Sequence, residues 1–288
     1  EKHMILVFGK TGQVSQELRK NKDILCLNRM QADLSDPLSC HKAIVKYNPT
    51  AVINAAAYTA VDRAEEEEDL ANVINGEAPS AMAKTCAKIN IPLVHISTDY
   101  VFDGEKGSVW QTSDTTNPQN AYGRSKLKGE KAIVASGCTY AILRTSWVIS
   151  PYGTNFVKAM LSLSETKDRL TVVDDQIGGP TCARDIAQAC KIIAQILINR
   201  PEKSGIYHFS GTPDVSWSDF AKIIFEQAGR KTAVTPIKTV EYPTPALRPR
   251  NSRLNCKSTE STFNIPRPKW CEGLKDILRD LGISHETT

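Results

Sequence analysis

Tyr122 and Lys126 stand four residues apart in the run from Ala121 to Lys126, which places both side chains on one face of an expected helix. A free tyrosine, with a pKa of about 10, is a poor acid-base group near neutral pH. A neighbouring ammonium group is expected to lower that pKa, so that Tyr122 can give a proton to a developing alkoxide. Lys126 can also hydrogen-bond the ribose of a nicotinamide cofactor. The pair therefore indicates carbonyl reduction, with two unrelated side chains on an exposed helix as the alternative.

Thr98 adds a third group suited to the same chemistry. It lies at the end of an expected strand, in the segment from Ser97 to Phe102, and its hydroxyl group can polarise a substrate carbonyl. A Tyr-x-x-x-Lys pair is common by itself. A glycine-rich turn, Thr98 and the pair in this order, each on a suitable element, favour an active site over coincidence.

The glycine-rich turn follows the first expected strand, Met4–Phe8. Gly9 and Gly12 allow a tight turn and let the backbone approach a pyrophosphate, and the next helix offers unpaired N–H groups and the positive end of its dipole. Ser15 stands where the usual fingerprint has a third glycine, so the helix must pack on the strand around a hydroxymethyl group. We interpret the turn as a dinucleotide site, with a plain loop as the alternative.

The end of the second expected strand bears on the choice of cofactor. An acidic residue about 20 residues after the glycines would hold the 2′-hydroxyl of NAD, whereas this chain has Asn28 and Arg29. This change removes repulsion toward a 2′-phosphate, so NADPH should be accepted, with NADH left open. The alternative is that Arg29 is a solvated surface charge. Asp33 and Leu34 follow at a spacing suited to flanking the adenine.

The elements expected around these residues form an α/β fold of the Rossmann type, with a doubly wound parallel sheet. Continuous apolar strands alternate with helices in the first half of the chain, a pattern typical of a sheet covered on both faces. Right-handed crossovers then give the doubly wound arrangement. The expected strands are Met4–Phe8, Ile24–Leu27, Ala51–Asn54, Pro92–Ser97 and Tyr140–Arg144, and the expected helices start near Gly12 and cover Pro37–Tyr47, Asp69–Asn90 and Asn120–Ser136.

After Thr145 the sequence predicts a smaller, loop-rich lobe. The stretch Val234–Pro268 is rich in Pro, Arg and Asn and lacks clear periodicity. We therefore assign residues 1–145 to an NAD(P)-binding domain and residues 146–288 mainly to a substrate-binding lobe, with helix 181–199 returning to the first domain. The elements expected in this half are strands Leu170–Asp174 and Ile206–Phe209 and helices Thr181–Asn199 and Trp217–Ala228.

The composition excludes several classes of protein. The net charge of +4 is small and the charges are interspersed, which argues against a nucleic-acid partner. The eight cysteines form no Cys-x-x-Cys pair, so we expect buried, reduced thiols rather than disulfides or zinc ligands. No stretch is long and apolar enough to span a bilayer, and we expect a cytoplasmic protein without a membrane partner.

The chain as a whole resembles the extended short-chain dehydrogenase/reductase family and, within it, the dTDP-4-dehydrorhamnose reductases. The second half carries the more specific part of this resemblance, because many relatives share only the first. The matching segments are FGKTGQV (Phe8–Val14), NAAAYTAVDRAE (Asn54–Glu65), STDYVFDG (Ser97–Gly104), AYGRSKLKGE (Ala121–Glu130), RTSWV (Arg144–Val148), the pair Asn155-Phe156, DDQIGGPT (Asp174–Thr181) and YPTPALRPRNSRL (Tyr242–Leu254).

The resemblance implies a function and a set of site residues. It implies NAD(P)H-dependent reduction of the 4-keto group of dTDP-4-dehydro-L-rhamnose, the last step of dTDP-rhamnose biosynthesis, which supplies O-antigen lipopolysaccharide. Thr98, Tyr122 and Lys126 would be the catalytic residues, and Thr98, Asp99 and Trp147 would meet the nucleotide sugar. The residues implied to line the dinucleotide are Gly12, Gln13, Val14, Asp33, Leu34, Ala57, Tyr58 and Thr59.

Arg248 lies in the Pro-rich segment, and its guanidinium fork suits a diphosphate. We interpret it as a ligand of the nucleotide sugar, with a solvated surface arginine as the alternative.

Mg²⁺ is the one cofactor implied by the family that this sequence puts in doubt. Family members have been associated with Mg²⁺ at a subunit contact, and Glu17 fits the first acidic position. Arg184 stands where another carboxylate is expected after Pro180, and a cation there opposes a metal ion. We therefore expect no metal ligands and leave a monomer and a homodimer open.

Two other functions fit parts of the sequence. The same chemistry could act on another nucleotide-4-ketosugar. A non-catalytic NADP-binding subunit of the same fold is the second alternative, because the regulatory subunit of methionine adenosyltransferase resembles this chain in the STDYVFDG and RPRN segments. The intact Thr98, Tyr122 and Lys126 favour catalysis.

Overall fold

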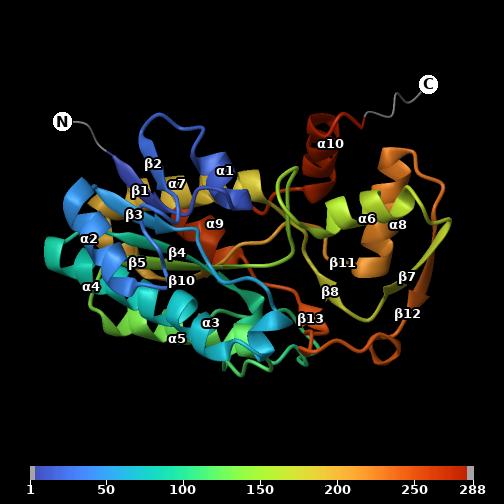
Figure 1. The fold of residues 1–288 in the computed structure, drawn as a ribbon, viewed down its shortest axis with the longest axis horizontal. Coiled ribbons are helices and arrows are strands. Elements are labelled where there is room, and N and C mark those ends of the chain that lie inside the picture. Colours follow the sequence, from blue (N-terminus) through green and yellow to red (C-terminus); the bar gives the residue numbers. More distant parts are fainter. Residues whose placement is uncertain (1–3, 284–288) are drawn as a thin grey trace.

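The computed structural model describes residues 4–283, and within them the largest sheet has six parallel strands in the order β10-β5-β4-β3-β1-β2 (Figure 1). Most of these strands are largely apolar, and each pairs in register with its neighbours, as in Ile5↔Ile24 and Ile5↔Ala51. This confirms the predicted doubly wound α/β fold. The strands are β1 (Ile5–Phe8), β2 (Ile24–Leu27), β3 (Ala51–Asn54), β4 (Leu93–Thr98), β5 (Tyr140–Thr145) and β10 (Gly205–His208).

Helices cover both faces of this sheet because the strands are buried on both sides. On one face, an apolar cluster joins Leu6 and Ile142 of the sheet to helices α2 (Pro37–Tyr47), α4 (Ala78–Ile89) and α5 (Ala121–Ala135). On the other face, a second cluster joins Val7 and Leu143 to α1 (Gln13–Leu18), α7 (Ala183–Asn199) and α9 (Lys257–Phe263). Thus α7 lies against the sheet although it follows residue 146 in the chain.

The helix predicted over Asp69–Asn90 is interrupted. It consists of α3 (Glu68–Asn72), a π-helical turn (Val73–Glu77) and α4. Asn75, in the π turn, is 1% exposed and exchanges two hydrogen bonds with the backbone of Tyr58, at 2.8 and 2.9 Å. The extra residue of the turn thus lets a buried side chain leave the helix and satisfy a loop.

The second lobe has a core of its own, built from the helices α6 (Phe156–Ser164), α8 (Trp217–Ala228) and α10 (Trp270–Asp280) (Figure 1). The segment predicted as loops from Val234 to Pro268 also contains strands and α9. Its strands are very short or pair with distant segments, which explains why no periodicity revealed them. The strands of this lobe are β6 (Val148–Ile149), β7 (Arg169–Val173), β8 (Ile177–Gly178), β9 (Thr181–Cys182), β11 (Val215–Ser216), β12 (Ala233–Ile237) and β13 (Asn251–Ser252).

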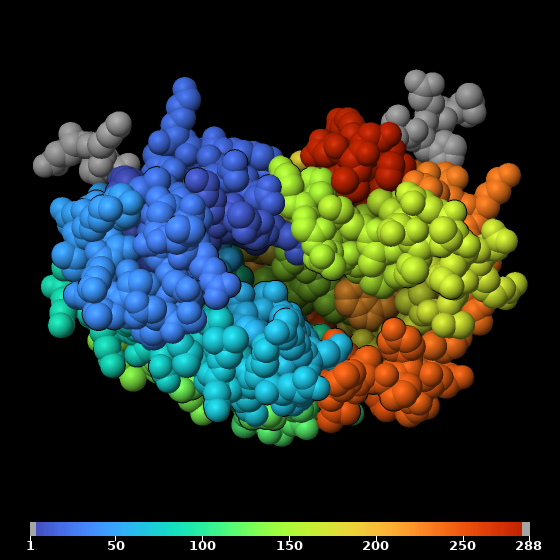
Figure 2. Space-filling view, in the orientation of Figure 1, coloured from blue at the N-terminus to red at the C-terminus, as the bar shows by residue number. Residues whose placement is uncertain are grey.

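The predicted strands Leu170–Asp174 and Ile206–Phe209 correspond to β7 and β10, each shifted by one residue. Short 3-10 turns complete the described elements, at Arg63–Glu65, Asp99–Val101, Pro201–Lys203 and Thr239–Glu241. A hollow separates the sheet domain, blue to cyan, from the yellow-green and orange second lobe (Figure 2). No helix among residues 4–283 is long and apolar enough to cross a membrane.

Candidate active site

The carboxyl ends of β1, β3 and β4 mark the point at which the strand order reverses direction. The chain passes from β1 outward to β2 and then returns to place β3 on the other side of β1. Loops that leave neighbouring strands in opposite directions open a crevice, which is where open α/β sheets bind ligands. The segments after Phe8, Asn54 and Thr98 all start at this edge.

The glycine turn accommodates Ser15 through Gly9. Gly9 has a φ of +105°, and a Cβ atom at this position would lie 2.7 Å from the Ser15 Oγ. Ser15 itself is 0% exposed and packs under the turn. The missing third glycine therefore does not prevent helix α1 from packing on β1, because the first glycine leaves the room that the hydroxymethyl group needs.

Gln13 and Val14 differ in what they can offer a cofactor. No side chain caps the start of α1, so the first N–H groups of the helix keep their bonding capacity. The Gln13 Oε1 accepts hydrogen bonds from the Ser150 Oγ at 2.6 Å and from the Asn155 Nδ2 at 3.2 Å. Val14 is buried in the apolar cluster under the sheet. Gln13 thus links the glycine turn to the second lobe, and only the backbone of Val14 remains for a ligand.

The segment after β2 holds its polar groups in a local network. The Arg29 Nε lies 3.3 Å from the Asp33 Oδ2, and the Arg29 side chain is 81% exposed. Hydrogen bonds donated by the Ser35 hydroxyl and backbone lower the pKa of Asp33. The Asn28 Oδ1 accepts from the Gln31 backbone at 3.0 Å. Leu34 is buried. Arg29 is therefore a largely exposed, positively charged side chain at the end of β2, held by one contact to Asp33.

Tyr58 belongs to the segment Ala57–Thr59 that follows β3. Its hydroxyl donates to the Glu67 Oε2 at 2.6 Å, and its ring shares an apolar cluster with Ala64 and Tyr122. Ala57 and Tyr58 are half-buried, whereas Thr59 is exposed. The loop expected to line the cofactor and the residue expected to give the proton therefore border the same apolar cluster.

Asn75 supports this loop and was not singled out from the sequence. Besides its two bonds to Tyr58, its Nδ2 donates to the Ser125 Oγ at 3.0 Å. Ser125 precedes Lys126 on α5. The available signal was the pair Asn75-Gly76 in the middle of the predicted helix, because both residues are poor helix formers.

Helix α5 carries Tyr122 and Lys126 at its amino-terminal end. The Asn120 side chain caps this end by accepting from the Gly123 N–H at 2.7 Å. The Lys126 Nζ donates to the Ile96 carbonyl oxygen at 2.7 Å, and Lys126 is 3% exposed. Burial lowers the pKa of Lys126 to about 8, against the opposing effect of Glu130. Lys126 therefore does not lie in bulk solvent.

The pKa of Tyr122 differs from the sequence-based expectation. Burial and the Asp99 carboxyl raise it, while the Thr98 hydroxyl acts in the opposite direction. Because the Lys126 ammonium is directed at Ile96, it is not among the groups that shift the phenol in this arrangement. The predicted lowering by Lys126 is therefore not observed, although Tyr122, Thr98 and Asp99 are close enough to influence one another.

Asp99 is a buried carboxyl group beside Tyr122. It is 3% exposed, and burial raises its pKa to about 7, with the Ser252 hydroxyl as the largest opposing influence. Within residues 4–283, its Oδ2 has no hydrogen-bond partner. Thr98 accepts a hydrogen bond from the Tyr100 backbone at 3.1 Å through its Oγ1. An unpartnered buried acceptor next to a phenol is suited to a hydroxyl group of a ligand.

Trp147 and Arg248 are the predicted site residues that come from the second lobe. Trp147 has a φ of +48° and stacks on Trp217, with ring centroids 3.5 Å apart and planes 12° apart. Arg248 forms a two-pronged ion pair with Asp62, at 2.8 and 3.0 Å, and its side chain is 23% exposed. Arg248 is thus neither freely solvated nor free of a partner, which neither sequence-based alternative anticipated.

A groove of about 470 Å³ lies beside Arg248. Tyr100, Asn117, Tyr242 and Arg250 contribute to its lining. Tyr100 connects the groove to the site, because its ring lies 5.6 Å from that of Tyr122 in an edge-to-face arrangement. The groove provides aromatic, amide and guanidinium groups within reach of the catalytic edge.

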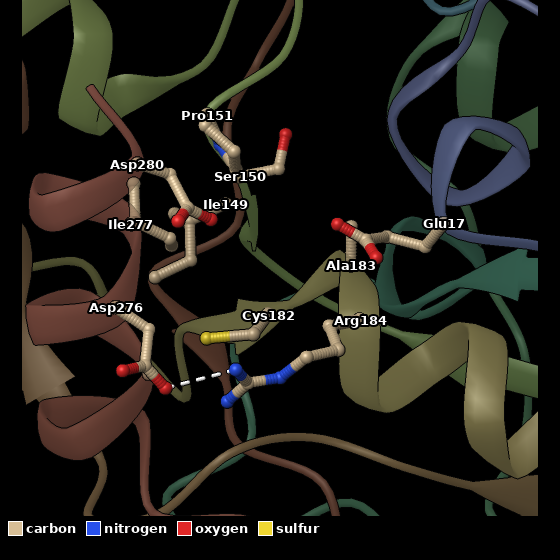
Figure 3. Close-up of a pocket in the computed structure, with 11 residues that line it drawn as sticks. Glu17, Ile149, Ser150, Pro151, Cys182, Ala183, Arg184, Asp276, Ile277 and Asp280 are labelled. Carbon is tan, nitrogen blue, oxygen red and sulfur yellow. Dashed lines mark hydrogen bonds and ion pairs between the residues drawn. The ribbon is translucent and has the colours of Figure 1, made fainter. Parts of the chain in front are cut away.

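The residues around Glu17 do not fit a Mg²⁺ ion. Arg184 reaches into this pocket and its Nη1 lies 2.8 Å from the Asp276 Oδ2 (Figure 3). Mg²⁺ requires an octahedron of oxygen ligands. The guanidinium group of Arg184 instead extends between the carboxylates of Glu17 and Asp276. Among the described residues, no group of three or more His, Cys, Asp or Glu side chains is arranged to hold a metal.

All eight cysteines lie within residues 4–283 and are free thiols, and all except Cys271 are buried.

A parallel sheet of this order, with a glycine turn after its first strand and a Tyr-Lys helix at its carboxyl edge, defines the class of Rossmann-type short-chain dehydrogenase/reductases.

Comparison with known proteins narrows this class. The chain belongs to the family described as the RmlD substrate binding domain, whose model matches residues 3–283. It is 43% identical over 284 residues to a dTDP-4-dehydrorhamnose reductase of Sinorhizobium fredii, covering 95% of this chain and 96% of that protein. It is 38% identical to the enzyme of the same name from Salmonella typhimurium, covering 96% and 97%. The crystal structure of a dTDP-4-dehydrorhamnose reductase from Bacillus anthracis in complex with NADP superposes with a TM-score of 0.90 at 34% identity, covering 97% of this chain and 100% of that one.

Proposed function

We propose that this protein uses NAD(P)H to reduce the 4-keto group of dTDP-4-dehydro-L-rhamnose to dTDP-L-rhamnose. The observation that carries the proposal is the meeting of Tyr122, Thr98 and a buried Lys126 at the carboxyl edge of β4. Full-length similarity to proteins named for this reaction supports the choice of substrate.

The reaction divides into a hydride and a proton. When bound, NAD(P)H supplies the hydride that adds to C4 of the sugar. Tyr122 donates its phenolic proton to the carbonyl oxygen as negative charge develops there, and the Thr98 hydroxyl hydrogen-bonds the same oxygen. Lys126, buried one helical turn away with its ammonium directed at the Ile96 carbonyl, would hydrogen-bond the ribose of the nicotinamide. A proton from solvent then restores the phenol of Tyr122.

The cofactor residues divide between backbone and side chains. Gly9, Gly12, Gln13 and Val14 would offer backbone at the pyrophosphate, and a Cβ atom at Gly12 would come no closer than 4.0 Å to Ala55 and Ser15. Tyr58, with Ala57 and Thr59 beside it, would line the nicotinamide end. The groups that would surround the adenosine are those of Asn28, Arg29, Asp33 and Leu34.

The substrate would lie between the two lobes. Trp147 would contact the deoxysugar, and the unpartnered Asp99 carboxyl would accept a sugar hydroxyl. Arg248 would reach the diphosphate from its position beside the groove, while Asp62 holds its guanidinium.

The test is NADPH oxidation in the presence of dTDP-4-dehydro-L-rhamnose. Tyr122→Phe should lower kcat by about 10²- to 10⁴-fold, the usual contribution of a positioned general acid, and leave NADPH affinity unchanged. Tyr207→Phe serves as the matched control, because its hydroxyl bonds the Lys203 carbonyl away from the site. Equal activity of Tyr122→Phe and wild type would remove the proposal.

A panel of nucleotide 4-ketosugars separates the two alternatives. Faster turnover of another sugar would assign the same chemistry to a different substrate. A wild-type protein that binds NADPH but reduces none of them would be the non-catalytic subunit.

The cytoplasm is the proposed location, since all seven buried cysteines are free thiols. We expect a nucleotide sugar, and neither nucleic acid nor membrane, as partner, and a monomer or a homodimer.

A further inference from the structure

Trp147 adopts a backbone conformation that tryptophan rarely occupies. Its φ of +48° lies in the left-handed region, which costs a bulky residue on the order of 1–3 kcal/mol. Two hydrogen bonds hold this bend: the Thr181 N–H donates to the Trp147 carbonyl at 3.0 Å, and the Ser146 Oγ donates to the Gly179 carbonyl at 3.0 Å. Such strain persists where the surroundings determine it, and it commonly marks functional sites.

Neighbouring residues also fix the position of the Trp147 ring. Trp217 stacks on it at a centroid distance of 3.5 Å, and Phe156 lies behind Trp217 at 4.5 Å. At Gly178, an added Cβ atom would lie 2.9 Å from the Trp147 Cε2, so only a glycine leaves room for the ring. Trp147 nevertheless remains half-buried, so part of its ring stays accessible.

One pair of short strands positions both neighbours of Trp147. β11 pairs antiparallel with β8, with Val215 opposite Gly178 and Ser216 opposite Ile177. Trp217 follows Ser216 directly, and the Ser216 hydroxyl caps α8 by accepting from the Asp219 N–H at 3.1 Å. The register of two residue pairs therefore sets the distance between the glycine and the supporting indole.

We propose that Trp217 is a positioning residue that holds the Trp147 ring in place for the deoxysugar. This inference rests on the proposed function. A deoxysugar presents C–H groups and a methyl group, which gain from contact with a rigid aromatic surface. Trp217 fixes that surface before the sugar arrives, so that binding does not have to order the Trp147 side chain. Trp217 itself takes no part in the chemical step.

Binding of dTDP-L-rhamnose, measured by calorimetry with the full chain, tests the inference independently of turnover. Trp217→Ala should weaken binding about tenfold, and Trp217→Phe should restore most of it because a phenyl ring can still stack. The matched control is Trp270→Phe, which alters a 1% exposed tryptophan of the same core whose ring packs edge-to-face on Phe220. Among active preparations, Trp217→Ala should raise KM about tenfold while kcat stays within about a factor of three.

Circular dichroism supplies a readout that a general loss of stability would not reproduce. Two indoles stacked at 3.5 Å should give a coupled band. It should disappear in Trp147→Phe and in Trp217→Phe and remain in Trp270→Phe. Unchanged affinity in a folded Trp217→Ala variant overturns the inference, as does an equal loss in Trp270→Phe. Intact binding without turnover by wild type overturns the proposed function alone, and wild type that fails to bind dTDP-L-rhamnose overturns both.

Discussion

Burial shifts the pKa values of Asp99 and Lys126 in opposite directions, so that each side chain favours its neutral form. The pKa of Asp99 rises to about 7 and the pKa of Lys126 falls to about 8, because each loses water without gaining a full counter-charge. Both groups therefore change protonation within the range in which an enzyme of this kind works. A protonated Asp99 can donate a hydrogen bond, whereas an ionised Asp99 can only accept.

The raised pKa of Asp99 makes stability depend on pH. Between about pH 4 and pH 7 the carboxyl is ionised in the unfolded chain and protonated in the folded one, so its contribution is lost as pH rises through that window. The difference in unfolding free energy between wild type and Asp99→Asn should fall by on the order of 4 kcal/mol across it. Urea unfolding at several pH values measures this, with the exposed Asp168→Asn as control. A flat difference would contradict the burial argument.

Arg29 is the residue that we propose to set the preference between NADPH and NADH. Its single contact to Asp33 is 3.3 Å long and its side chain is 81% exposed, so it can turn toward a 2′-phosphate at little cost. Arg29→Asp should lower the ratio of kcat/KM for NADPH to that for NADH by about tenfold or more, since it exchanges attraction for repulsion. Steady-state kinetics with each cofactor measures the ratio. An unchanged ratio would make Arg29 a plain surface charge.

At the scale of elements, glycines decide how closely α5 approaches the sheet and the π turn. A Cβ atom on Gly123 would lie 2.3 Å from the Tyr100 carbonyl oxygen, and one on Gly129 would lie 2.2 Å from that of Asn75. Both contacts are with backbone, which cannot move aside without shifting a strand end or a helix. The position of Tyr122 and Lys126 over β4 therefore depends on missing side chains.

Gly123→Ala distinguishes packing from helix propensity. Propensity alone would stabilise α5 by about 0.5–1 kcal/mol, whereas the clash should destabilise the protein by about 2 kcal/mol or more and displace Tyr122. The free energy of unfolding, measured with denaturant, and kcat should both fall. Gly107→Ala is the control, because a Cβ there meets nothing within 4 Å. A stabilised Gly123→Ala variant would show that α5 can shift freely.

At the scale of the whole molecule, contacts from the segments that follow β1 and β3 join the two lobes. Gln13 bonds Ser150 and Asn155, and Asp62 holds Arg248 while its Oδ1 also accepts from the Ala246 N–H at 3.1 Å. Gln13 is the first residue of α1, which follows β1, and Asp62 lies in the segment that follows β3. Binding on one side of the hollow can therefore influence the geometry of the other.

A double-mutant cycle measures the second of these links. Asp62→Ala and Arg248→Ala should each raise KM for the nucleotide sugar and leave NADPH affinity unchanged. Because the Asp62 side chain is 42% exposed and screened, the coupling between the two should be only about 1 kcal/mol. Strictly additive effects would mean that Asp62 does not position Arg248. An unchanged KM in Arg248→Ala would remove its proposed role at the diphosphate.

The sequence by itself determined the sheet domain and the order of its chemical groups. The apolar runs of β1 to β5 are continuous and local, so their burial could be predicted from neighbouring residues. Tyr122 and Lys126 could be placed on one helix face for the same reason. The helix interrupted at Asn75 was predicted as continuous, because a π turn preserves the local apolar pattern.

Only the tertiary structure decided which distant residues support the site. Asp62 and Arg248, like Trp147 and Trp217, meet through loops and two-residue strands whose pairing leaves no period in the sequence. The direction of the pKa shift of Tyr122 could not be predicted for the same reason. It depends on burial and on Asp99, and both are set by packing across the chain. Local patterns specify elements, whereas the contacts between elements depend on the packing of the whole chain.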